Sequence, residues 1–113
     1  MNERDSSYLS VVGGAALNEE TVRERHGEDA TDRAAQIIAA VRVARDALRG
    51  ATTSADMQDR SSHLFAIMRN AARAALHAPE KDRAAISDLA RWHDETGVVA
   101  MIEDPSLLDR ELE

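Results

Sequence analysis

The feature that most constrains the fold is a run of apolar side chains that recur every three or four residues near the middle of the chain. In the stretch AAQIIAAVRVARDALRG, residues 34–50, they fall on one helical face: Ile37, Ile38, Val41, Ala44 and Leu48. Asp29 or Thr31 is a candidate N-cap before this run, and Gly50 is a candidate stop after it. The pattern predicts a helix of about 18 residues, which is about 27 Å long.

The same period occurs twice more toward the C-terminus. In residues 53–78, Thr53 or Ser54 is the candidate cap and Pro79 ends an apolar stripe through Met57, Leu64, Phe65, Met68, Ala72, Ala75 and Leu76. In residues 79–97 the proline falls in the first turn, and the expected buried side consists of Ala85, Ile86, Leu89, Trp92 and His93. Both segments are predicted helices.

A shorter helix is predicted from Asn18, which precedes glutamates in the first turn and a glycine at the end. Because the connections are short, neighbouring helices should run antiparallel. We therefore predict an all-α fold, a small antiparallel helical bundle with three main helices and short flanking helices. In this division residues 1–17 are an N-terminal arm, residues 18–97 are the bundle, and residues 98–113 are an extension with a short helix from Asp104 or Pro105.

Two short apolar runs, residues 9–12 and 98–102, are ambiguous between strand, extended chain and buried turn. One alternative pairs them as a minor two-stranded ribbon, although an isolated ribbon is only marginally stable. Gly13 and Gly14, after the first of these runs, resemble the double-glycine leader of secreted bacterial peptides over this short stretch alone. The acidic, cysteine-free remainder differs from such peptides, so we interpret the glycine pair as a hinge.

The predicted core is thin, because hydrophobic residues make up 43% of the chain but aromatic residues only 3%. Much of the remainder is alanine, which favours helices and lets two helix backbones approach closely. Self-association would thicken such a core. We therefore expect a homodimer joined through the two long helices predicted within residues 28–50 and 53–78.

Charge is distributed unevenly in a chain whose net charge is −7. Residues 33–78 contain seven basic and three acidic side chains, whereas the segments on either side are acidic. Acidic flanks would dock onto a basic protein surface, and complementary charge raises both the association rate and specificity. The residues that we expect to carry this contact are Glu19, Glu20, Glu24, Glu103, Asp104 and Asp109.

The basic middle segment supports a different interpretation. Arg42, Arg45 and Arg49 share one helical face, and Arg69 and Arg73 form a second pair, so together they would contact an acidic partner or nucleic acid. The simpler interpretation is a solvated face with local ion pairs, in which Asp46 pairs with Arg42 and Asp56 with Arg60. An overall pI near 5.0 argues against nucleic acid as a ligand.

Several kinds of chemistry are not expected. The chain has no cysteine, which excludes disulfides, thiolate metal sites and cysteine nucleophiles. His63 and His77 would be about 21 Å apart on one helix and cannot share a metal ion. No nucleophile motif is present, so we expect neither an enzyme nor a bound metal or cofactor.

The apolar runs are too short to span a membrane and the first residues do not form a secretory signal, which favours a cytoplasmic protein. The expected function is that of a protein-binding inhibitor or adaptor of phage or mobile-element type, for example an anti-defence protein or an antitoxin. A nucleic-acid-associated regulator is the first alternative, and a small helical enzyme is the second.

Overall fold

The computed structural model describes residues 18–110. This part of the chain contains α1 (Glu19–His26), α2 (Glu28–Arg49), α3 (Ser54–His77), α4 (Glu80–Trp92) and α5 (Thr96–Glu103), followed by the short 3-10 helix η2 (Pro105–Arg110). It contains no strand. The predicted all-α fold is confirmed. The arm predicted in residues 1–17 lies outside the described residues.

A capping box begins α1, and a glycine turn precedes the first residue of α2. The Asn18 side chain accepts a hydrogen bond from the Thr21 amide at 2.9 Å, and the Thr21 hydroxyl accepts one from the Asn18 amide. Gly27 then turns the chain with φ of 96°, a conformation that favours glycine, and α2 starts at Glu28. The caps predicted at Asp29 and Thr31 are therefore wrong, because Thr31 lies inside the helix, where its hydroxyl donates to the Gly27 carbonyl.

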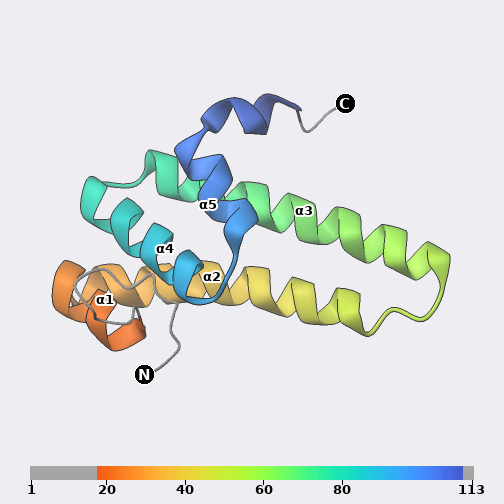
Figure 1. Cartoon of the computed structure of the whole chain (residues 1–113), viewed down its shortest axis with the longest axis horizontal. Coiled ribbons are helices and arrows are strands. Elements are labelled where there is room, and N and C mark those ends of the chain that lie inside the picture. The colour runs from red at the N-terminus through yellow and green to blue at the C-terminus, as the bar shows by residue number, and fades with distance from the viewer. Residues whose placement is uncertain (1–17, 111–113) are drawn as a thin grey trace, which may run out of the picture.

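The two longest helices form a hairpin. In Figure 1, α2 and α3 run antiparallel and side by side, with 22 and 24 residues respectively. Thr53 caps α3 as predicted, since its hydroxyl accepts from the Asp56 amide at 3.0 Å. α4 and α5 have only 13 and 8 residues, and they cover the half of the hairpin that lies away from the α2–α3 connection. We call this covered part the inner half, and residues 45–65 the outer half.

The core is centred on the inner half. Its fully buried side chains come from all five α-helices: Val22, Ala34, Ile38, Val41, Ala72, Ala75, Ala85, Ile86, Leu89, Ala90 and Val98. Many of them are alanines, which allow the helices to pack closely without large side chains between them.

Three predicted core residues are instead exposed. Met57 and Phe65 are each 54% exposed, and Trp92 is 46% exposed. Met57 and Phe65 lie in the outer half of the hairpin, which α4 and α5 do not reach (Figure 1). Trp92 is the last residue of α4 and lies beyond its last buried turn, and His93, also predicted to be buried, is only partly so. Periodicity predicted which faces of these helices are apolar. It did not predict how far neighbouring helices extend over those faces.

The run at residues 98–102, left open above between strand, extended chain and buried turn, lies inside α5. Val98 and Met101, three residues apart, are its buried side chains, and this is helical spacing. The ribbon is therefore not formed by this segment, and its other predicted strand, residues 9–12, lies outside the described residues. The short helix expected from Asp104 or Pro105 is η2, which begins at Pro105.

Candidate interaction surfaces

The three arginines predicted on one face of α2 do share a surface. Arg42, Arg45 and Arg49 line a hollow of about 300 Å³ that is completed by the connection between α4 and α5. The same hollow is lined by Asp46, Asp94 and Glu95. Three carboxylates therefore accompany the three guanidinium groups, so that the formal charge of these six side chains is balanced.

Arg45 forms an ion pair with a carboxylate of the same chain. Its Nε donates to Glu95 Oε2 at 2.9 Å, and its Nη2 also bonds to this carboxylate. The hydrogen bond to Glu95 raises the pKa of Arg45 above its ordinary value, against the opposing effect of burial. Glu95 is only 2% exposed, so this pair fixes the α4–α5 connection onto α2.

Arg49 at the end of α2 and Arg60 on α3 also differ from the local pairs that the sequence predicts. Arg49 Nη1 lies 2.7 Å from Asp46 Oδ1, so Asp46 pairs with Arg49 and not with Arg42. Arg60 Nη1 donates to the carbonyl oxygen of Ala47 at 2.8 Å, and not to Asp56. The backbone carbonyl of the facing helix is a partner that charge spacing along one helix cannot reveal.

The second arginine pair lies on α3. The Arg69 guanidinium stands over the Phe65 ring, 5.1 Å from its centroid, which is the geometry of a cation–π contact. Arg69 and Arg73 are both half-buried, and neither lines the hollow of the α2 arginines. The five arginines therefore do not form one joint basic site.

The three acidic residues predicted on the first helix remain close together on α1. Glu20 and Glu24 are exposed and four residues apart. Glu19 pairs with Arg23 at 3.1 Å, and Arg23 also bonds to Asp32 at 2.6 Å. α1 thus presents two exposed carboxylates beside an internally paired group.

The three acidic residues predicted near the C-terminus lie elsewhere. Glu103 ends α5 and pairs with Arg91, and Asp104 accepts a hydrogen bond from the Ser106 hydroxyl at 2.6 Å. Asp109 is exposed on η2. In Figure 1, η2 lies on the opposite side of the molecule from α1, so the two acidic groups do not form one surface.

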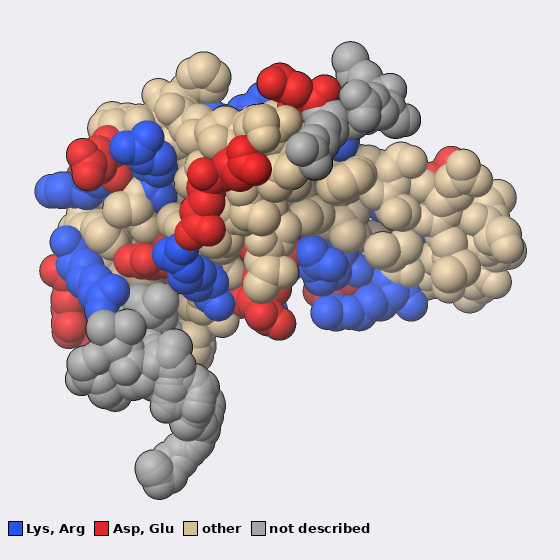
Figure 2. Space-filling model, turned by 45° about the horizontal axis from the view of Figure 1, so that its top comes forward, with Lys and Arg blue, Asp and Glu red and all other residues tan. Residues whose placement is uncertain are grey.

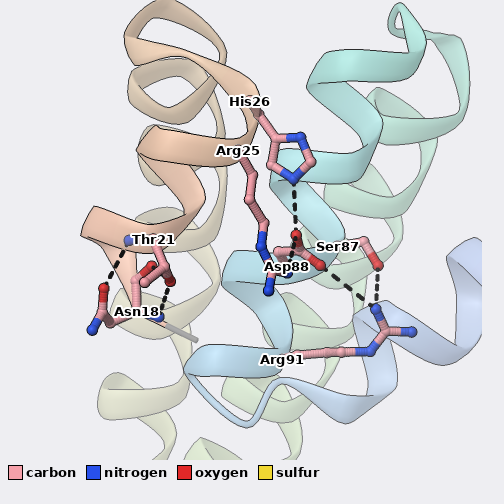
Figure 3. A network of polar contacts seen from close by, with 7 residues as sticks. All are labelled: Asn18, Thr21, Arg25, His26, Ser87, Asp88 and Arg91. Carbon is pink, nitrogen blue, oxygen red and sulfur yellow. Dashed lines mark hydrogen bonds and ion pairs between the residues drawn. The ribbon is translucent and has the colours of Figure 1, made fainter. Parts of the chain in front are cut away.

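A polar network that sequence patterns did not reveal joins α1 to α4. Asp88 Oδ2 lies 2.8 Å from His26 Nε2, and Arg25 and Arg91 each approach the same carboxylate to 3.8 Å (Figure 3). Arg91 also donates to Ser87 Oγ at 3.3 Å. The Asp88 side chain is only 17% exposed, so this network holds α1 against the side of α4.

A second ion pair joins α2 to the start of α4. Arg33 Nε and Nη2 donate to the two oxygens of Asp82, at 2.6 and 3.0 Å. The Arg33 guanidinium holds the pKa of the Asp82 carboxyl below its usual range, against a smaller opposing effect of burial. These partners are 49 residues apart in sequence, which no local spacing rule detects.

Within residues 18–110, no three histidine, aspartate or glutamate side chains are grouped closely enough to hold a metal ion. No helix in the same range combines the length and the apolar composition that a membrane crossing requires. Comparison with protein-family models, with curated proteins and with solved structures found no match to this chain.

Proposed function

We propose that this protein acts by binding another protein, as a small inhibitor or adaptor, and that the exposed carboxylates of α1 contact a basic surface of that partner. The supporting observation is that Glu20 and Glu24 are exposed on a helix that is itself firmly anchored. Val22 of α1 is fully buried, and His26 contacts Asp88 of α4. A fixed pair of carboxylates loses little freedom on binding and attracts basic partners.

The C-terminal acidic residues support this role less well, because Glu103 and Asp104 already have partners within the chain. The arginine face is a weaker candidate for nucleic acid for the same reason. Arg45 is held by Glu95 and Arg49 by Asp46, and phosphate binding requires several free cations at once. We therefore restrict the proposal to a protein partner.

The test is cross-linking and affinity capture from cells that contain the native protein, with captured protein and nucleic acid both identified. We compare the wild type with Glu20→Lys/Glu24→Lys and with Asp59→Lys/Glu80→Lys, a control that makes the same change of charge on α3 and α4. The proposal predicts one basic protein whose affinity falls about tenfold or more in the α1 variant only, and whose binding weakens with salt.

Two results would contradict this function. The first is capture of a protein whose affinity is the same for all three chains, because the α1 carboxylates would then be irrelevant. The second is capture of nucleic acid that is lost when Arg42 is replaced by glutamate, which would transfer the function to the arginine face.

A further inference from the structure

The outer half of the α2–α3 hairpin is an unfinished part of the core. Leu64 is 6% exposed and Leu48 is half-buried, but Met57 and Phe65 each leave more than half of their surface exposed. Figure 2 shows a mostly uncharged surface over this end of the hairpin, at the right of the view. We propose that this face is covered by the same face of a second copy of the chain, which gives a symmetric dimer.

Continuity with the core indicates what kind of surface would complete it. In the inner half, the same sides of α2 and α3 are covered by α4 through Ala85, Ile86 and Leu89, all of which are buried. The missing cover is therefore a helical, apolar surface. The outer half of another hairpin is such a surface, because α3 presents Met57 and Phe65 there beside the packed α2 helix.

The charge of the outer half favours a second copy over a strongly charged partner. Residues 45–65 contain three arginines and three aspartates, so their formal charge is zero, whereas the whole chain carries −7. All three arginines have partners within the chain, in Glu95, Asp46 and the Ala47 carbonyl. Two copies can therefore meet at this face without the repulsion that their net charges produce elsewhere.

The α4–α5 connection determines how two copies can fit. Glu95 binds Arg45, and the backbone of Gly97 is so close to Met68 that a Cβ atom there would lie 2.3 Å from the methionine Cε. The α4–α5 connection thus marks the end of the covered part of the hairpin, near Arg45 and Met68. A second hairpin fits only over the outer half, with its tip pointing the opposite way. This arrangement is a two-fold contact in which each copy contributes the same residues.

The size of the face predicts the strength of the dimer. From Ser54 to Phe65 the helix extends about 18 Å, and two helices packed about 9 Å apart give a width of about 20 Å. Such a face buries a few hundred Å² on each copy, less than the roughly 800 Å² per partner of a standard interface. We therefore expect weak self-association, with a Kd of about 10–100 μM.

The test is sedimentation equilibrium of the full chain from about 5 to 500 μM, which brackets the expected Kd. Three chains are compared: the wild type, Met57→Ser/Phe65→Ser, and the control Val43→Ser. Val43 is 69% exposed and lies on α2 outside the outer half. We expect the wild type and the control to dimerise with similar Kd, and the double variant to be at least about tenfold weaker.

Concentration-dependent NMR shifts provide a second readout and should be confined to residues 45–65 and the adjoining connection. A wild type that stays monomeric across the range would overturn the proposal, as would a dimer that is unaffected by the double substitution or abolished by Val43→Ser. Because Glu20 and Glu24 lie outside this face, Glu20→Lys/Glu24→Lys should dimerise normally. Failure of the dimer and failure of the proposed function are thus separate results.

Discussion

The two halves of the α2–α3 hairpin have similar sequence patterns but different surroundings. In the inner half, Ile38, Val41 and Ala72 are at most 1% exposed because α4 and α5 pack over them. In the outer half, Met57 and Phe65 continue the apolar stripe and remain exposed. The difference shows that an apolar stripe determines which way a helix faces, while the length of its neighbours determines whether that face is buried.

Two ion pairs formed by arginines of α2 differ in the same way, one at the boundary between the halves and one within the outer half. Arg45 and Glu95 meet where the α4–α5 connection crosses the hairpin, and the Glu95 side chain is only 3% exposed. Arg49 and Asp46 meet in the outer half, where their side chains are 71% and 69% exposed. Water screens the second pair far more than the first, so the two pairs should contribute unequally to stability.

The largest predicted effect concerns paired truncations in the two halves. Leu89→Ala removes a fully buried side chain that covers the inner half, and should lower the free energy of unfolding by about 2–5 kcal/mol. Met57→Ala removes an exposed side chain and should cost less than about 1 kcal/mol. Urea denaturation at low protein concentration measures both. Equal costs would show that the outer half is as well packed as the inner half.

A smaller effect is predicted for the ion pairs. Glu95→Gln weakens charge-assisted hydrogen bonds in a buried position, and should lower the free energy of unfolding by about 1.5–3 kcal/mol. Asp46→Asn, its exposed counterpart, should change it by less than about 1 kcal/mol. Urea unfolding at two salt concentrations checks this difference. If Asp46→Asn proved the more harmful, the connection would not be what fixes the boundary between the halves.

The smallest effect is a pH dependence at the connection itself. Burial, and secondarily the charge of Arg42, lower the pKa of His93 below 6.5, although Glu19 and Glu95 act in the opposite direction. The folded state therefore takes up a proton at His93 less readily than the unfolded chain does. The contribution of neutral His93 to the free energy of unfolding is therefore fully present above the ordinary pKa of 6.5. It is lost as the pH falls through the lowered value.

Replacing His93 by glutamine should therefore make stability decline less steeply on acidification. Urea unfolding of the wild type and His93→Gln at about pH 7.5 and pH 5.5 measures the difference, which should be small because the ring is partly solvated. An unchanged slope would mean that the histidine is as well hydrated in the folded protein as in the unfolded chain.

Local sequence rules predicted much of the fold but little of the candidate site. The caps at Asn18 and Thr53 were predictable because capping depends on residues within one turn. The run at residues 98–102 stayed open between strand, extended chain and buried turn, because a five-residue apolar run is too short to distinguish these from a buried helix. The Arg45–Glu95, Arg33–Asp82 and His26–Asp88 contacts join residues 49 to 62 positions apart, and only the packing of the helices brings them together.

Amide hydrogen exchange along α2 and α3 at low protein concentration tests most directly the claim that the hairpin has one covered and one uncovered half. Amides near Ile38 and Ala72 should exchange at least about 100-fold more slowly than those of residues 47–60, because only the inner half is held by tertiary packing. Raising the concentration into the range of the proposed dimer should slow exchange in the outer half. Uniform protection along both helices at every concentration would contradict the account.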